Sequence, residues 1–282
     1  MNSKKGAIKV SETQLQELIE KISIQLYHYQ IGLVKLKRTN SSEDAIPAGS
    51  GTLVEIDGLY AILTAQHVIK ELPKSGDIGL MISPDIEKPI VKSEFLNKIE
   101  VARGSIESEG PDLGIILLPS PIVGQLKAKK SFYNLSLKRD KILSDPPKNY
   151  KGIWFLCGMP AEMTTTEGPS KGFNVIKRFT LFCGAARVKK EYSKGEYDYF
   201  VVDAHYNETN QLPESFGGIS GGGLWQVILK QQKGKVEAEE MILSGVVFYQ
   251  SPLSNNIRLL KCHGRRSIYK NTFDVVKKCD SS

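Results

Sequence analysis

Three short segments of this 282-residue chain carry residue types that could act together on an acyl group. His67 ends one apolar stretch, Asp112 begins another, and Ser220 lies inside the glycine-rich sequence GGISGGG. A serine hydroxyl becomes a good nucleophile when a base takes its proton, and a histidine oriented by a carboxylate is such a base. The three residue types therefore match what nucleophilic acyl transfer needs.

Each segment taken alone also has an ordinary structural explanation. A histidine at the end of a hairpin strand is more often structural, and an aspartate at the start of an apolar strand is usually a turn or cap residue. The glycines around Ser220 could form a plain flexible loop or a phosphate-binding loop, although no Lys-Ser/Thr pair or helical pattern follows, as a P-loop requires. The chemical interpretation therefore depends on the three segments together.

Together the segments resemble the motifs of the trypsin-like (chymotrypsin-fold) serine peptidases. That family carries TAAH, then an aspartate before a short apolar strand, then GxSGG; this chain has TAQH, PDLGIILL and GISGG in the same order. The resemblance extends from about residue 32 to residue 276 and includes the sequence CGMP, which is similar to a GxP turn of many bacterial members. It implies a serine endopeptidase, an intracellular bacterial-type member, with His67, Asp112 and Ser220 as catalytic residues.

The resemblance also assigns residues to the oxyanion hole and to substrate binding. By the family pattern, the backbone N–H groups of Gly218 and Ser220 would form the oxyanion hole, and the first position needs the permissive dihedral angles of glycine. A peptide substrate would lie as an added β-strand along the edge formed by Phe248, Tyr249 and Gln250.

The residues expected to line the pocket for a substrate side chain predict different preferences. Glu214 lies six residues before the serine, where trypsin-like enzymes hold the aspartate that selects basic side chains, and this predicts cleavage after Lys or Arg. Gln250 stands in place of a glycine and could narrow the pocket. His263, Arg265 and Arg266 fall near the expected opposite wall and would favour an acidic side chain. The sequence leaves the specificity open.

Three departures from secreted members of the family are informative. Ile219 stands where those enzymes have the aspartate that binds a new N-terminus, so we expect no activation by N-terminal trimming. Val68 and Phe216 replace half-cystines, which agrees with a reducing compartment. Phe248 replaces a residue whose hydroxyl usually braces the aspartate, which leaves open how Asp112 is held.

Local patterns predict strands flanked by helices. Residues 11–28 carry a capping box, formed by Ser11 and Gln14, and apolar residues at helical spacing. From residue 31 onward, short runs of Val, Ile, Leu and Tyr are separated by turn residues, as in β-sandwiches and barrels. Asp57-Gly58 predicts a tight hairpin between strands 52–56 and 59–64. Further strands are expected at 113–118, 153–157, 179–188, 199–204, 224–229 and 241–249, and a short closing helix at 272–278.

We therefore expect an all-β fold of two antiparallel β-barrels of the chymotrypsin type, with an added N-terminal helix and a short C-terminal helix. The helical extension would span 1–30 and the first barrel, with His67 and Asp112, 31–125. The remainder, 126–282, would hold the second barrel with Ser220 and the C-terminal helix, after a polar, lysine-rich connection at 124–151. The whole would form one peptidase unit, and the N-terminal helix is a candidate restraint on its activity.

Composition narrows the class of protein. Hydrophobic residues make up 40% and charged residues 24% of the chain, as in soluble globular proteins. The apolar runs fall far short of the roughly 20 residues that span a bilayer, and no secretory apolar region follows the N-terminus. We expect a cytoplasmic protein that does not bind membranes. The four cysteines form no CxxC pair, so we expect free thiols, no metal and no cofactor.

The net charge of +7 bears on the partners. Basic residues are scattered without an aromatic-basic signature, which favours a solvated basic surface and disfavours nucleic acid as a partner. The expected partners are a protein or peptide substrate and a regulatory protein. Two alternatives stay open: a catalytically inactive trypsin-like fold that acts as a protein-binding module, and a basic nucleic-acid or membrane-surface protein in which the motif is accidental.

Overall fold

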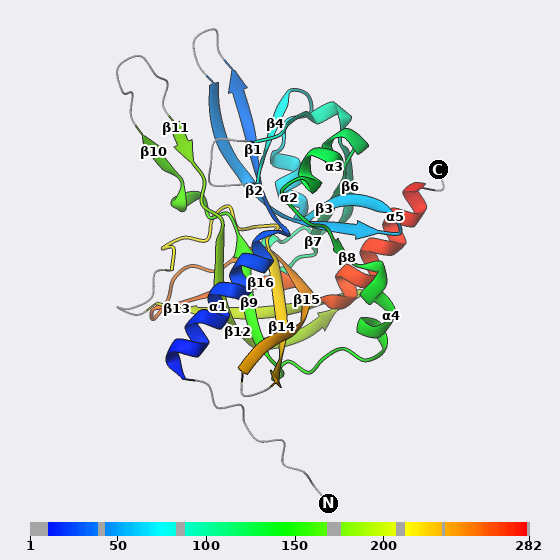
Figure 1. Cartoon of the computed structure of the whole chain (residues 1–282). Helices are drawn as coiled ribbons and strands as arrows, with labels where there is room; N and C mark the ends of the chain where they lie inside the picture. Colours follow the sequence, from blue (N-terminus) through cyan, green and yellow to red (C-terminus); the bar gives the residue numbers. More distant parts are fainter. Residues whose placement is uncertain are drawn as a thin grey trace, which may run out of the picture.

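The computed structural model describes residues 11–38, 43–82, 88–167, 176–206, 212–232 and 235–280. Two β units lie against each other, and helices stand at both ends of the described chain (Figure 1). One unit is an eight-stranded sheet and the other is a closed barrel of six strands. The expected mostly-β fold with N-terminal and C-terminal helices is confirmed.

The first unit is a half-barrel. Its strands run in the order β5-β4-β1-β2-β3-β7-β6, with β8 paired to β2. The sheet was expected to close, but its end strands β5 and β6 do not pair, and the 3₁₀ turn η1 (Ser93–Phe95) separates them in the chain. The strands are β1 (Gln30–Arg38), β2 (Glu43–Ile56), β3 (Leu59–Thr64), β4 (Asp77–Met81), β5 (Ile90–Lys92), β6 (Asn97–Arg103), β7 (Asp112–Leu117) and β8 (Tyr133–Asn134).

The predicted hairpin joins β2 to β3. Asp57 and Gly58 have φ angles of 48° and 87°, the left-handed pair that a tight two-residue turn needs. β3 also pairs with β7 in antiparallel register, so that Thr64 faces Gly114. Because the two strands run in opposite directions, the residues that follow β3 lie beside those that begin β7.

The second unit closes in the order β12-β13-β16-β15-β14-β9. The predicted strands of this region are confirmed, and most extend beyond the predicted bounds. A separate two-stranded ribbon, β10 (Thr165–Glu167) with β11 (Ile176–Arg178), is not part of the barrel and lies on the side of β1 and β2 (Figure 1). The barrel strands are β9 (Ile153–Gly158), β12 (Phe182–Lys194), β13 (Tyr197–His205), β14 (Gly223–Gln232), β15 (Lys235–Gln250) and β16 (Ile257–His263).

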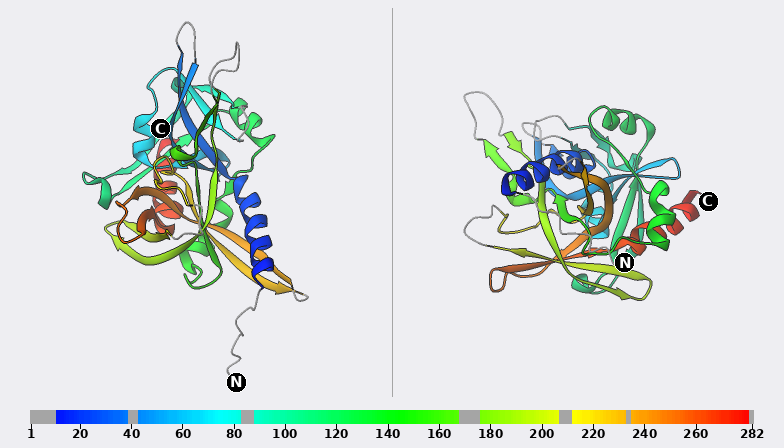
Figure 2. Two further views of the ribbon diagram at one scale, coloured as in Figure 1. Left: turned by 90° about the vertical axis from the view of Figure 1, so that its left-hand side faces the viewer. Right: turned by 60° about the horizontal axis from the view of Figure 1, so that its bottom comes forward.

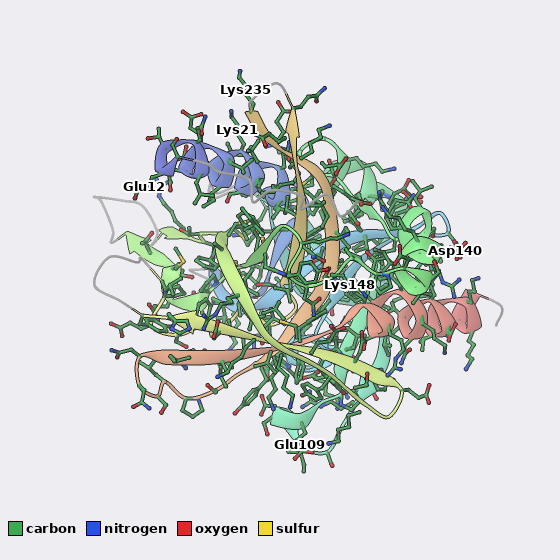
Figure 3. The ribbon with its side chains drawn as sticks, turned by 90° about the horizontal axis from the view of Figure 1, so that it is seen from below. Glu12, Lys21, Glu109, Asp140, Lys148 and Lys235 are labelled. Carbon is green, nitrogen blue, oxygen red and sulfur yellow. The ribbon has the colours of Figure 1, made fainter. Side chains whose placement is uncertain are left out.

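The predicted N-terminal helix is α1 (Glu12–Tyr27), and Ser11 and Gln14 form the expected capping box. Its apolar face is buried in the same core cluster as residues of both β units. The helix runs along the hairpin of β14 and β15 (Figure 2), and Lys21 of α1 lies near Lys235 at the hairpin end (Figure 3). No described helix combines the length and apolar character needed to cross a bilayer.

The stretch 124–151 is more than a connection. After α3 (Ser120–Lys127) it contains β8, which joins the first sheet, and α4 (Ser136–Ser144). Tyr133, Leu135 and Ile142 of this stretch pack in the main core. The many lysines around them made the stretch look like a solvent-exposed connection in the sequence. Before α5 (Phe273–Asp280), the C-terminal helix contains a π-helical segment, Ser267–Thr272.

Candidate active site

His67 and Asp112 meet where β3 and β7 end side by side. His67 lies in the first turn of α2 (Gln66–Glu71), directly after β3, and Asp112 is the first residue of β7. The Asp112 carboxylate accepts two hydrogen bonds from the histidine. The His67 backbone N–H lies 2.9 Å from Oδ1, and the ring Nδ1 lies 2.6 Å from Oδ2. The histidine is thus held by both its backbone and its ring.

The carboxylate of Asp112 is buried, with 1% of its side chain exposed. Burial alone would raise the pKa of Asp112, but the hydrogen bonds from His67 and the charge of Arg103 outweigh burial, so that the pKa is lowered. Arg103, its neighbour across β6 and β7, places Nη1 2.8 Å from Oδ2. The carboxylate is therefore held in the charged form, which can orient a histidine and stabilise its imidazolium.

A second histidine braces Asp112 from the other β unit. His263 of β16 is fully buried, and its Nε2 accepts a hydrogen bond from the Asp112 backbone N–H at 2.8 Å. Its ring lies 4.9 Å from that of Phe248 and 5.2 Å from that of Tyr199, measured between centroids. Burial lowers the pKa of His263 to about 4, so the ring is neutral and able to accept. Asp112 is thus held by His263 and Arg103, which the sequence did not identify as its partners.

Ser220 lies in a tightly bonded loop that leads into β14. The Ile219 N–H donates to the carbonyl of Phe216, and the Gly222 N–H donates to that of Ile219. Gly221 donates to Val247 of β15, at 2.7 Å. The loop is fixed both by its own turns and by the neighbouring strand.

Two N–H groups of this loop have no acceptor within the described chain. They belong to Gly218 and Ser220, the pair expected to form an oxyanion hole, and neither donates a backbone hydrogen bond. Gly218 has φ of +90°, and a Cβ there would lie 2.8 Å from the Met159 carbonyl oxygen, so the position requires glycine. Two unpaired donors in one loop could bind an oxygen that carries negative charge.

Ser50 of β2 ties this loop to the first β unit. Its N–H donates to the Ser220 carbonyl at 2.8 Å, and its hydroxyl donates to the Gly218 carbonyl at 2.7 Å. The same hydroxyl accepts the Met159 N–H at 2.7 Å, and Thr64 donates to the Ser50 carbonyl. Ser50 is fully buried, so these contacts set the position of the loop against the end of β3.

The serine loop and the histidine approach each other at Gly49. A Cβ at Gly49 would lie 2.6 Å from the Val68 side chain and 3.2 Å from the Ser220 carbonyl oxygen. The residue after His67 and the backbone of Ser220 are thus packed around the same point. No hydrogen bond among the described residues joins the Ser220 hydroxyl to His67; such bonds often tighten only when substrate is bound.

The C-terminal end of β15 offers a strand edge beside the serine loop. β14 begins at Gly223, opposite Val246, so residues 248–250 have no partner in β14. Tyr249 and Gln250 are half-buried, whereas the Phe248 side chain is 1% exposed and packs on His263. Of Phe248 only the backbone is therefore available to a substrate, because its ring fills the space behind Asp112.

Gln250 reaches from this edge to the segment that precedes the serine. Its Oε1 accepts the Phe216 N–H at 2.9 Å, and its Nε2 donates to the Ser215 hydroxyl at 3.2 Å. The side chain therefore bridges the end of β15 and the segment that precedes the serine loop.

Glu214 does not occupy a buried pocket floor. It is exposed, and its N–H and that of Ser215 donate to the Glu162 carboxylate at 2.8 and 2.7 Å. A preference for Lys or Arg depended on a desolvated carboxylate, because an exposed ion pair contributes only about 0–1 kcal/mol. The observed position does not supply that desolvation.

The basic residues expected opposite Glu214 also lie elsewhere, and that expectation is wrong. His263 contacts Asp112. Arg265 is buried and donates to Ser244 and to the carbonyl of Pro147, and the Arg266 N–H donates to Asp198. His263 and Arg265 are buried, whereas Arg266 is half-buried and its guanidinium donates to the Gly195 carbonyl. These partners are distant in sequence, so local sequence does not reveal them. Within the described residues no cluster of three His, Cys, Asp or Glu could hold a metal ion.

Comparisons with known proteins give distant structural matches only. No protein-family model matches the chain, and no curated protein matches it. A catalytically inactive tobacco etch virus protease complexed with substrate is 13% identical over 92% of this chain and 86% of its own, with a TM-score of 0.38. The serine endoprotease from Yersinia pestis is 14% identical over 90% and 63%, with a TM-score of 0.38.

A third structure, concerning folding and binding of the Sesbania mosaic virus VPg protein, is 16% identical over 85% of this chain and 88% of its own, with a TM-score of 0.41. At such low identities and TM-scores, the function must be argued from this chain's own side chains.

Proposed function

We propose that this protein is a serine endopeptidase, with Ser220 as nucleophile, His67 as general base and Asp112 as the residue that orients the histidine. The observation that carries the proposal is the buried Asp112 carboxylate, hydrogen-bonded to both the backbone and Nδ1 of His67. The serine loop beside the histidine adds to it, because its Gly218 and Ser220 N–H groups have no acceptor among the described residues.

In the proposed reaction, a peptide adds to the edge of β15 at residues 248–250 and places its scissile carbonyl over Ser220. Nε2 of His67 takes the hydroxyl proton as the oxygen attacks, while Nδ1–H donates to Asp112. The negative charge on the carbonyl oxygen is stabilised by the N–H groups of Gly218 and Ser220.

The tetrahedral intermediate then collapses to an acyl-enzyme. His67 returns its proton to the leaving amine, the carbon–nitrogen bond breaks, and the acyl group stays on Ser220. A water molecule, deprotonated by the same imidazole, hydrolyses the ester and restores the hydroxyl. Asp112 stays ionised throughout, and its lowered pKa supports that role.

We further propose that the side chain before the scissile bond is small and uncharged. Gln250 bridges the expected pocket walls through Phe216 and Ser215, so little room is left for a long side chain. Glu214 is exposed and offers no buried charge for Lys or Arg.

The test of the activity is covalent labelling with a fluorophosphonate probe, which reacts with a serine activated by a histidine. The native chain should be labelled at Ser220, confirmed by mapping the modified peptide. Ser220→Ala should abolish labelling, and Ser215→Ala, a neighbouring loop serine, should retain it. Equal labelling of native protein and Ser220→Ala would refute the assignment.

A non-catalytic peptide-binding module is the second candidate, and two observations favour it. The Ser220 hydroxyl has no hydrogen bond to His67 among the described residues, and Gln250 spans the expected pocket. In that case peptides would bind the β15 edge without being cleaved. Binding of peptides that remain intact, together with no fluorophosphonate labelling, would establish this candidate.

A further inference from the structure

Two cysteines face each other across adjacent strands of the closed barrel. Cys157 of β9 and Cys183 of β12 are direct partners in the antiparallel register, and their sulfur atoms lie 3.0 Å apart. A disulfide bond is about 2.05 Å long. A closing movement of about 1 Å would therefore suffice to join two side chains that already point at each other.

The two thiols differ in chemical character. A hydrogen bond with Cys157 lowers the pKa of Cys183, whereas burial raises the pKa of Cys157. Cys183 is half-buried and Cys157 is fully buried. Since the thiolate is the form that reacts with an oxidant, Cys183 is suited to react first and Cys157 to resolve the product.

The remaining cysteines lack this arrangement. Cys262 is fully buried, and burial raises its pKa, so its thiol is protected. Cys279 is exposed in α5. Neither forms a sulfur–sulfur contact within the described residues, which leaves Cys157 and Cys183 as the described pair able to form an intrachain disulfide without rearrangement.

The pair lies directly behind the serine loop. A Cβ on Gly222 would lie 2.0 Å from the Cys157 carbonyl oxygen, and one on Gly158 would lie 2.5 Å from the Ile219 side chain. A side-chain hydrogen bond also links Cys183 to Ser23 of α1. A bond between the two sulfurs would thus connect strands that support both the loop and the N-terminal helix.

We propose that Cys157 and Cys183 form a redox site, which hydrogen peroxide converts into an intrachain disulfide between β9 and β12. In the first step the Cys183 thiolate attacks one peroxide oxygen, the O–O bond breaks, and the sulfenic acid forms while hydroxide leaves and takes up a proton as water. In the second step the Cys157 sulfur attacks that of Cys183, the S–O bond breaks, and a second water leaves with the thiol proton. Two thiols are oxidised and one peroxide is reduced to two waters.

The experiment uses the full folded chain, first reduced and then treated with hydrogen peroxide at a low molar excess. The protein is denatured with N-ethylmaleimide to block free thiols, digested and analysed by mass spectrometry. We expect a linked pair of peptides containing Cys157 and Cys183 that has lost two hydrogen atoms. If dithiothreitol is added before the N-ethylmaleimide, it should reduce the disulfide to two thiols, and both cysteines should then be alkylated.

Cys279→Ser is the matched control at an exposed cysteine and should retain the linked peptides, whereas Cys183→Ser should lose them. Two results would overturn the proposal. In one, Cys183 is oxidised to sulfinic acid while Cys157 is recovered as the alkylated thiol; in the other, both thiols stay intact while Cys279 is oxidised. The measurement needs no peptidase activity, so its result is independent of the proposed function.

Discussion

Replacing His263 by glutamine tests the neutral, buried imidazole that braces Asp112. A glutamine oxygen can reach the position of Nε2, so His263→Gln keeps an acceptor for the Asp112 N–H but removes the titrating ring. The neighbouring rings of Phe248 and Tyr199 stay in place. The variant therefore separates the bracing hydrogen bond from the protonation of the imidazole.

The difference between the pKa of His263 in the unfolded and in the folded chain sets how much stability is lost at low pH. Burial lowers the pKa of His263 from 6.5 to about 4, so the unfolded chain takes up this proton at a higher pH than the folded chain. The stability that the neutral ring contributes is fully present above pH 6.5 and is lost as the pH falls toward 4. At about 1.4 kcal/mol per pKa unit the total loss is about 3 kcal/mol, of which about 2 kcal/mol is lost by pH 5.

The contribution of Asp112 to the free energy of unfolding changes at a lower pH than that of His263. Its pKa is lowered from 3.8, so its share of the stability is present above that pH and is lost only as the pH falls further. Measurements between pH 7.5 and 5 therefore report on His263 with little contribution from Asp112.

The assay is urea unfolding followed by fluorescence of the buried Trp154 and Trp225 at pH 7.5, 6 and 5. The free energy of unfolding of the native chain should fall by about 2 kcal/mol more than that of His263→Gln over this range. His28→Gln, at an exposed histidine, is the matched control and should follow the native chain. A difference between native chain and His263→Gln that is constant with pH would refute the reasoning.

Three further predictions concern the candidate site. Asp112→Asn should leave the fold intact and lower kcat by about 10⁴, as when a triad aspartate becomes asparagine; a loss of less than tenfold would point to another carboxylate, such as Asp77, or to none. Gln250→Gly should raise kcat/KM for peptides with a long or aromatic side chain before the scissile bond by at least about tenfold relative to alanine, which corresponds to about 1.4 kcal/mol; an unchanged peptide-library profile would contradict the pocket proposal. Ser50→Ala should cost about 1–3 kcal/mol of unfolding free energy, because the Met159 N–H and the Gly218 carbonyl lose their partner, and a urea midpoint equal to that of the native chain would show that these bonds contribute nothing.

Local rules predicted those parts of the molecule that depend on near neighbours in the chain. The capping box of α1 and the Asp57-Gly58 hairpin were found because each needs only a few consecutive residues. The stretch 124–151 was misjudged because its β8 pairs with β2, a partner distant in sequence. The first sheet was expected to close, and whether a sheet closes is decided by the lengths and the meeting of its end strands.

The same division holds for the candidate site. The residue types and chain order of His67, Asp112 and Ser220 were visible in the sequence, because each lies in a short motif. The residues that hold the site in place were not visible in the sequence. His263 contacts Asp112 from 151 residues further along the chain, and Ser50 and Gly218 are 168 residues apart.

Sequence alone therefore determined which residues could carry the chemistry and part of the secondary structure, since backbone preferences and hydrophobic spacing act over a few residues. It did not predict β4, β6 or β16, nor the helices α3 and α4. Tertiary structure decided how Asp112 is held, that Gln250 bonds Phe216 and Ser215, that Glu214 stays in solvent and that Cys157 faces Cys183. Each of these depends on which distant segments pack together, and packing is a property of the whole folded chain.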